Sequence, residues 1–263
     1  MLPKLLKSLL ADPRSEGIDL DSPQATQLHR ELIRRKPFLR RLYAAYYRRF
    51  EQADRAAPEG IRLEIGSGGG FLGESVDGLV TMDVRPGAQV DMVASALEMP
   101  LGDGSVGAVF MLNVLHHLTD VEAFFEEAQR VLTPGGRCIM IEPFVSPLSR
   151  VIYTRLHHEP FDPDMESWKL EGSGAMSTAN DALPWIVFVR DRRQFERRFP
   201  ELEITGVEPH TISLYLLSGG LSYRGIAPAA LFPLLARAEE MPGGVRRMLA
   251  SMMTVELKKK TMR

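Results

Sequence analysis

Three absences narrow the class of protein before any motif is considered. The chain of 263 residues has one cysteine, Cys138, so no disulfide can form within it and a reducing compartment is expected. No run approaches the roughly 20 consecutive apolar residues that a membrane-spanning helix needs. Residues 1–17 carry lysines inside their apolar part and lack the uninterrupted core of a secretory signal. We therefore expect a cytoplasmic protein.

An excess of charge of one sign is also lacking. The 32 Lys and Arg against 34 Asp and Glu give a formal net charge of -2, which disfavours a nucleic-acid binder that is basic throughout. Basic clusters do occur, at residues 29–50, 190–198 and 258–260. Their simplest interpretation is a solvated surface. The functional alternative is an anionic acceptor or peripheral contact with the inner membrane face.

The apolar pattern changes near residue 60. Helical spacing continues through residues 22–36, with Ser22 as a candidate N-cap, and through residues 38–50. Five short and nearly continuously apolar runs follow, as expected of strands buried on both faces, at residues 61–66, 79–84, 90–95, 106–112 and 137–143. Between the last two, Thr119 or Asp120 begins a predicted helix that Pro134 and two glycines end. This alternation predicts βα units around a mostly parallel sheet.

The pattern is weaker beyond residue 143. Helices are predicted at 147–157, 191–199 and near 229–241, and strands at 202–210 and 251–260. The fold class we expect is α/β, with a doubly wound, mostly parallel, seven-stranded Rossmann-like sheet in a single domain. Its predicted parts are an N-terminal helical cap (1–58), a cofactor-binding core (59–145), a lid (146–200), and C-terminal strands and a helix (201–263).

A glycine-rich turn directly follows the first predicted strand in "RLEIGSGGGFLG". Glycine permits a sharp turn and lets a ligand approach the backbone. Gly68, Gly70 and Gly73 satisfy the G-x-G-x-x-G pattern of dinucleotide sites, but an earlier register starts at Gly66, at the strand end. Glu64 would oppose a pyrophosphate and suits an ammonium group, and only about nine residues lead to the next strand. Both observations disfavour NAD.

Four segments in order, spanning roughly residues 60–145, resemble class I S-adenosylmethionine-dependent methyltransferases of the broad small-molecule type. They are "LEIGSGGG", "TMDV", "ALEMPLGDGSVGAVFMLNVLHHL" and "EEAQRVLTPGGRCIMIEP". The resemblance implies S-adenosylmethionine as the cofactor. The contacts it implies are Gly66, Ser67 and Gly68 for the methionine part, Glu64 for the loop or the amino group, Asp83 for the ribose hydroxyls, Val84, Ala96 and Leu97 for the adenine, and Asn113 beside the sulfonium.

Two positions depart from the family's pattern. Ser95 stands where an acid often contacts the adenine amine, and Gly107 stands where the fourth strand often begins with aspartate. Neither departure removes the core of the implied site. Helices before the first strand commonly cap the cleft in this family, so Tyr46 or Tyr47 could line it, although packing in the core is the simpler role.

Two histidine pairs are candidates for the chemistry. His117, with His116 before it, follows the fourth strand at the sheet edge where ligands sit in open α/β folds. His157, His158 and Glu159 end the helix after the fifth strand. In the functional interpretation one of His117, His157 or His158 is a general base that Glu159 orients. Helix-entry packing and helix termination are the alternatives. No metal is expected, because adjacent residues point apart and no i, i+4 pair supports a site.

These observations predict methyl transfer to a small-molecule, glycan-linked or lipid-linked acceptor, at oxygen. A non-catalytic S-adenosylmethionine-binding protein has the same loop and remains an alternative. An NAD-dependent oxidoreductase is a weaker alternative, since no Tyr-x-x-x-Lys pair follows the fourth strand. A nucleic-acid methyltransferase is disfavoured because "NVLHHL" stands where an Asn-Pro-Pro-Tyr type segment would be expected.

Overall fold

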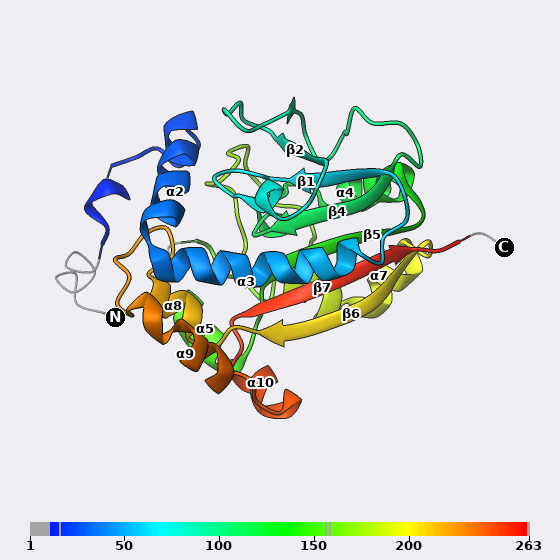
Figure 1. Cartoon of the computed structure of the whole chain (residues 1–263). Helices are drawn as coiled ribbons and strands as arrows, with labels where there is room; N and C mark the ends of the chain where they lie inside the picture. Colours follow the sequence, from blue (N-terminus) through cyan, green and yellow to red (C-terminus); the bar gives the residue numbers. More distant parts are fainter. Residues whose placement is uncertain (1–10, 16, 156, 158, 262–263) are drawn as a thin grey trace.

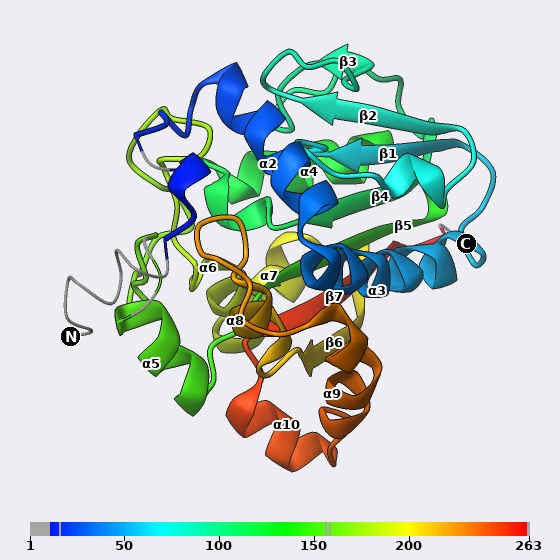
Figure 2. The same ribbon diagram turned by 60° about the vertical axis from the view of Figure 1, so that its left-hand side comes forward.

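The computed structural model describes residues 11–15, 17–155, 157 and 159–261, and its centre is one seven-stranded sheet (Figures 1 and 2). The strand order is β3-β2-β1-β4-β5-β7-β6. The first five strands are parallel, and β7 is antiparallel to both of its neighbours. The predicted mostly parallel α/β sheet is therefore confirmed. The strands are β1 (Ile61–Ile65), β2 (Leu79–Asp83), β3 (Met92–Val93), β4 (Val106–Leu112), β5 (Leu132–Pro143), β6 (Leu202–His210) and β7 (Met252–Lys259).

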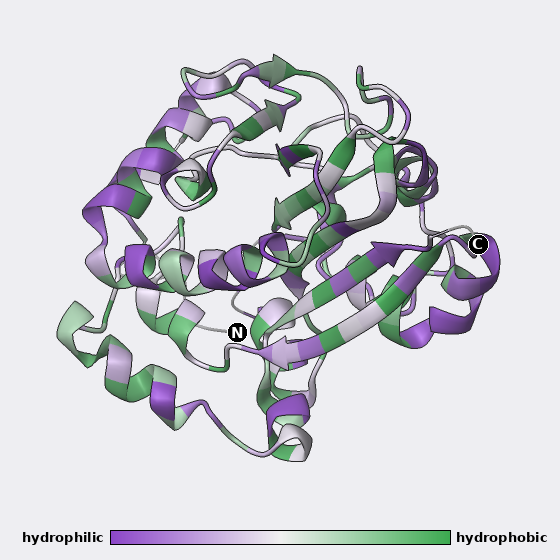
Figure 3. Cartoon of the chain, turned by 45° about the vertical axis from the view of Figure 1, so that its right-hand side comes forward, coloured by the Kyte–Doolittle hydropathy of each residue, from purple (hydrophilic) through white to green (hydrophobic). Residues whose placement is uncertain are grey.

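Each face of the sheet packs against its own set of helices. Along β4 the side chains alternate, with Val109 and Met111 in one core and Ala108 and Phe110 in the other. Apolar strands in a polar shell are visible in Figure 3. The first face is covered by α4 (Val121–Val131), α6 (Leu183–Trp185) and α7 (Arg192–Arg198), and the second by α3 (Pro37–Asp54), α8 (Leu214–Ser218) and α9 (Phe232–Ala238).

Helix α3 takes the place of the helix that would normally join β1 to β2. That connection holds only a 3-10 helix at Leu72–Glu74, as the short spacing after the glycine turn implies. Helix α3 therefore packs its aromatic stripe, including Tyr47 and Phe50, on this face. Helix α2 (Pro23–Arg35) starts at Ser22, whose hydroxyl accepts the N–H of Ala25 at 3.3 Å as predicted. Figure 1 shows α2 beside the carboxyl ends of β1 and β4.

One local expectation needs correction. Helix α4 ends at Val131 and β5 begins at once, so Pro134 and its two glycines lie inside the strand rather than after the helix. The pairing with β4 shifts there, from Val106 opposite Leu132 to Ala108 opposite Arg137, because extra residues are accommodated as a bulge.

Several helices of the C-terminal half are harder to predict from the spacing of apolar residues. Residues 183–190 form α6 and a π-helical turn whose side chains are mostly buried, so this segment packs in the core. Helix α5 (Pro147–Arg155) was predicted, whereas α10 (Gly243–Leu249) was not. Within the described part of the chain, no helix combines the length and the apolar character needed to cross a membrane.

Candidate functional site

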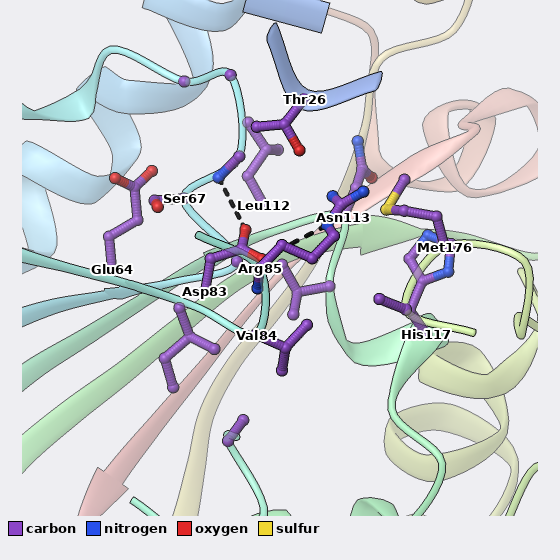
Figure 4. A pocket seen from close by; sticks show the side chains of 18 of the residues that line it. Thr26, Glu64, Ser67, Asp83, Val84, Arg85, Leu112, Asn113, His117 and Met176 are labelled. Carbon is purple, nitrogen blue, oxygen red and sulfur yellow. Dashed lines mark hydrogen bonds and ion pairs between the residues drawn. The ribbon is translucent and has the colours of Figure 1, made fainter. Parts of the chain in front are cut away.

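A cleft of about 310 Å³ lies at the carboxyl ends of the parallel strands (Figure 4). Because these ends meet at one edge of the sheet, loops distant in sequence converge there. All nine residues that the resemblance implied for the cofactor line this cleft. Their convergence is a structural fact, and their contact with a cofactor stays a prediction.

The glycine turn has the backbone that the sequence suggested. Gly66 has a φ of 67°, and a Cβ there would lie 2.5 Å from a Val114 methyl group, so only glycine fits. Its N–H donates to the carbonyl of Met82 at 2.8 Å, and the N–H of Gly68 donates to Asp83 Oδ2 at 3.1 Å. Ser67 Oγ is buried with no hydrogen-bond partner among the described residues. A ligand in the cleft could provide that partner.

Two buried carboxyl groups face the same end of the cleft. Glu64 is only 6% exposed, and its burial, with a contribution from the charge of Asp83, raises its pKa to about 8. Asp83 is also buried, and its Oδ1 accepts the N–H of Arg85 at 3.0 Å. A cationic ligand group here would meet both carboxyl groups, in addition to the Arg85 guanidinium, whose Nε lies 3.8 Å from Asp83 Oδ1.

The far wall of the cleft is formed after β4. Asn113 has a φ of 55°, which asparagine tolerates better than most residues, and its N–H donates to the carbonyl oxygen of Ile141 at 2.9 Å.

The structure explains the two departures from the family's pattern. At Gly107 a Cβ would lie 2.5 Å from the carbonyl oxygen of Pro58. An aspartate would not fit. Ser95 accepts the N–H of Leu97 at 3.1 Å and so supports the adenine side of the cleft through the backbone.

Several lining residues come from segments that sequence patterns did not connect to the strands. Helices α2 and α3 contribute Thr26, His29, Tyr43 and Tyr47, of which only Tyr47 was considered beforehand. Tyr46 does not line the cleft, and its hydroxyl instead pairs with Thr211 at 3.2 Å.

Residues 173–176 of the predicted lid also border the cleft. The carboxylate of Asp21 holds this loop by accepting the N–H of Met176 at 2.6 Å and the N–H of Ser177 at 3.2 Å. Gly-rich composition was the only sequence signal for this segment, and it does not indicate where the loop packs.

The candidate catalytic residues lie on one side of the cleft, in a buried cluster. His117 lines the cleft beside Met176, on the side opposite Glu64 (Figure 4). Its Nδ1 lies 3.1 Å from the carbonyl oxygen of Thr178, and burial lowers its pKa to about 4. Glu159 is close behind, within 4.8 Å of the nearest ring nitrogen. His158 lies outside the described residues.

Two partners in this cluster, Glu142 and Asp181, were not singled out from the sequence. Glu142 is fully buried, and its Oε2 lies 2.7 Å from His116 Nδ1. His116 Nε2 lies 3.4 Å from Glu159 Oε2, and Asp181 lies 2.9 Å from His157 Nδ1. Desolvation opposes charge on both rings, but the carboxylates outweigh it and raise the pKa of His116 and of His157. His157 and Glu159 do not line the cleft themselves.

The basic clusters are largely tied to protein groups. Arg40 pairs with Glu74 at 3.2 Å, and Arg49 pairs with Glu208 at 2.8 Å. Lys36 is buried and donates to the carbonyl oxygen of Gly220 at 3.0 Å. These contacts give a structural role to residues that the alternative assigned to a membrane surface, so peripheral membrane contact gains no support.

Comparison with known proteins shows which family the core of the chain resembles. Residues 63–140 match the family model described as methyltransferase domain. A ubiquinone biosynthesis O-methyltransferase from Paramagnetospirillum magneticum (strain ATCC 700264 / AMB-1) is 32% identical over 126 residues, which is 41% of this chain and 51% of that protein. The chain thus spans about half the length of the curated relative it matches.

Among solved structures, geranyl diphosphate C-methyltransferase from Streptomyces coelicolor A3(2) has 16% identity and a TM-score of 0.47, with 95% of this chain and 91% of that chain covered. The N-methyltransferase NodS from Bradyrhizobium japonicum WM9 has 12% identity and a TM-score of 0.43, with 90% and 99% covered.

The sheet order and the glycine turn agree with the class I methyltransferase fold that the sequence resembles, and the family match covers residues 63–140 of the sheet's parallel part.

Proposed function

We propose that the chain transfers the methyl group of S-adenosylmethionine to an oxygen atom of a small-molecule acceptor. The observation that carries this proposal is the single cleft in which Glu64, Asp83 and Asn113 converge while His117 closes the opposite side (Figure 4). The family match over the core supports methyl transfer. The relative named as an O-methyltransferase supports oxygen as the acceptor atom.

The cofactor would lie across the glycine turn. We assign Asp83 to the ribose hydroxyls, since a carboxylate at this strand end can accept both of them. Glu64 is assigned to the ammonium group, and Val84, Ala96 and Leu97 to the two faces of the adenine. Ser67 Oγ, buried without a protein partner, gains one from the methionine part. Asn113 then stands beside the sulfonium.

The reaction is a direct displacement. The sulfur–methyl bond breaks while the oxygen–methyl bond forms, and the acceptor hydroxyl loses its proton. Alignment of the two reactants can supply several kcal/mol of the barrier reduction. The histidine–carboxylate cluster is assigned to assist the proton loss, through His117 as the member that reaches the cleft, with Glu159 positioned behind it. The loop held by Asp21 would exclude water.

Thermal unfolding tests the cofactor. The purified chain is heated alone and with S-adenosylmethionine, S-adenosylhomocysteine or NAD. A ligand at 100 times its dissociation constant adds about 2.7 kcal/mol, which should raise the Tm by roughly 5–10 °C for a chain of this size. A shift with NAD alone would refute the proposal. A shift with both adenosyl compounds, but no methylated product from any acceptor class, would favour the non-catalytic alternative.

Two variants separate binding from chemistry. Asp83→Asn should weaken S-adenosylmethionine binding, whereas His117→Ala should keep it and lower turnover by roughly 10²–10⁴-fold. Asp77→Asn is the matched control, because this aspartate is exposed and does not line the cleft. Product formation is followed with methyl-labelled cofactor on small phenols, and on glycan-linked and lipid-linked hydroxyls as the competing acceptor classes. Equal turnover of His117→Ala and the control would contradict the assigned role.

A further inference from the structure

We propose that His116, His117 and Glu159 bind one divalent transition-metal ion at the acceptor side of the cleft. Each of the three residues offers a ligating atom, and these atoms all lie within 4.8 Å of one another. They come from two segments, the turn after β4 and the segment after α5. Because Glu159 is distant in sequence from His116 and His117, no sequence spacing indicates that the three residues form one site. Metal binding does not depend on the proposed methyl transfer, but the role given to the metal below does.

Both imidazole rings are oriented as metal ligands usually are. His117 Nδ1 lies 3.1 Å from the carbonyl oxygen of Thr178, which can only accept, so Nδ1 carries the hydrogen and Nε2 has the lone pair. His116 Nδ1 lies 2.7 Å from Glu142 Oε2. A metal-bound histidine almost always donates its other ring N–H to such a backbone carbonyl or carboxylate.

Glu142 is itself fixed in the accepting role. Its Oε1 accepts the N–H groups of Val114 and Leu115, both at 2.8 Å. Its Oε2 is therefore left to accept from His116. His116 Nε2 faces Glu159 Oε2 at 3.4 Å, and a metal ion would take the place of the proton between these two atoms.

The spacing suits an ion of ordinary coordination geometry. His116 Nε2 and Glu159 Oε2 are 3.4 Å apart. Two ligands about 2.1 Å from a tetrahedral ion are separated by about 3.4 Å. Asp181 Oδ1 is 3.9 Å from the same Nε2 and places a second carboxylate at the edge of the site. Small side-chain movements would bring the three ligand atoms, which lie within 4.8 Å of one another, to the separations of a tetrahedral site.

The charge and the donor atoms favour a transition metal. Three carboxylates, those of Glu142, Glu159 and Asp181, lie in this cluster with side-chain exposures of 0%, 13% and 1%. Burying carboxylates is costly unless nearby positive charge compensates them. His116 and His157 supply that charge in the metal-free protein, and a dication bound in exchange for a ring proton of His116 would supply two charges at one point. Two imidazole donors suit Zn²⁺ or Fe²⁺, whereas Mg²⁺ prefers oxygen ligands and retained water.

The ion would give the cluster a chemical role in the proposed reaction. A hydroxyl that coordinates a divalent ion loses its proton more readily, as metal-bound water does. The acceptor oxygen would bind at the open position of the ion, release its proton to solvent and then attack the methyl group. With the ion bound, His117 would assist the proton loss as a ligand of the ion rather than by accepting the proton itself.

Metal titration of the untagged full chain tests the site. After dialysis against a chelator, the chain is titrated with Zn²⁺, Mn²⁺ and Mg²⁺, and bound metal is measured with the Tm. We expect one equivalent of Zn²⁺ and a Tm rise of roughly 5–10 °C at 100 times the dissociation constant, with no shift from Mg²⁺. Fewer than about 0.1 equivalents of Zn²⁺ in the folded chain would overturn the proposal.

Variants locate the ion. His116→Ala, His117→Ala and Glu159→Gln should each lose Zn²⁺, while His210→Gln should retain it. His210 is a buried histidine whose two nitrogens pair with Thr211 and Thr254, away from the cluster, and it is the matched control.

The stabilisation by S-adenosylhomocysteine is measured in the same samples. If it persists in a variant, that variant is folded and its loss of Zn²⁺ is specific. Zn²⁺ binding that survives a combined His117→Ala and Glu159→Gln change would overturn the assignment. Zn²⁺ binding without any cofactor shift would leave the metal site standing and refute the proposed function instead.

Discussion

The pKa of Glu64 predicts that cofactor binding releases a proton. Burial raises this pKa to about 8 from the ordinary 4.5, so at pH 7 about nine-tenths of the free protein carries a neutral Glu64. An ammonium group placed beside a carboxyl lowers its pKa by about 1–3 units. Binding at pH 7 should therefore release roughly 0.4–0.9 proton, and affinity should rise about five-fold between pH 6 and pH 7 when the pKa falls by about 2 units.

Calorimetric titration measures this release directly. S-adenosylhomocysteine is titrated at pH 7 in two buffers with different ionisation enthalpies, and the difference in heat gives the protons released. Glu64→Gln should abolish both the release and most of the change in affinity between pH 6 and pH 7, because an amide does not titrate. Equal heats in the two buffers for the natural chain, or the same release from Glu64→Gln, would refute the reasoning.

The raised pKa of Glu64 also predicts how the stability of the ligand-free protein depends on pH. The folded state holds the Glu64 proton up to about pH 8, whereas the unfolded chain loses it above 4.5. The folded state thus binds more protons across this window, so the contribution of Glu64 to stability falls as pH rises, by up to about 5 kcal/mol. The Tm of the natural chain should fall between pH 5 and pH 8 relative to that of Glu64→Gln. A constant difference would contradict the assigned pKa.

Three further substitutions test the packing around the cleft. Gly66→Ala should abolish cofactor binding and lower the free energy of unfolding by about 1–3 kcal/mol, measured by denaturant unfolding. Gly78→Ala is the control in the same assay, because Gly78 has a similar φ of 66° but open space around it, so its loss reports the backbone strain alone. Phe125→Ala should cost about 3–5 kcal/mol in the same assay, since this side chain is fully buried among other aromatic rings. Asp21→Ala should free the loop at Ser177 and speed cofactor dissociation in stopped flow while the Tm stays nearly constant. An unchanged dissociation rate would show that the loop does not retain the ligand.

Much of the fold follows from short-range information. The strands β1, β2, β4 and β5 are apolar runs of the right length, and the Ser22 cap depends on neighbours three residues apart. The implied cofactor residues converge because each stands at the end of a parallel strand, and such ends share one edge of a sheet. The period of the apolar residues predicted the strands, whereas the resemblance to class I methyltransferases implied which residues at their ends would contact the cofactor.

The helical cap illustrates an intermediate case. The spacing after the glycine turn showed that no long helix could follow β1. Only the folded chain shows that α3 fills the resulting space on the sheet face, since apolar periodicity defines the buried side of a helix but not the surface it meets.

The acceptor side of the cleft was decided by tertiary structure alone. The sequence singled out His117 and Glu159. Glu142 lay in a segment that resembles the family but was given no role, and Asp181 lay in an unassigned segment. Folding brings these groups within hydrogen-bonding or ion-pairing distance of the histidines. Asp21 likewise meets Ser177 across 156 positions. Contacts of this kind depend on how separate segments pack, and no local period or spacing records them.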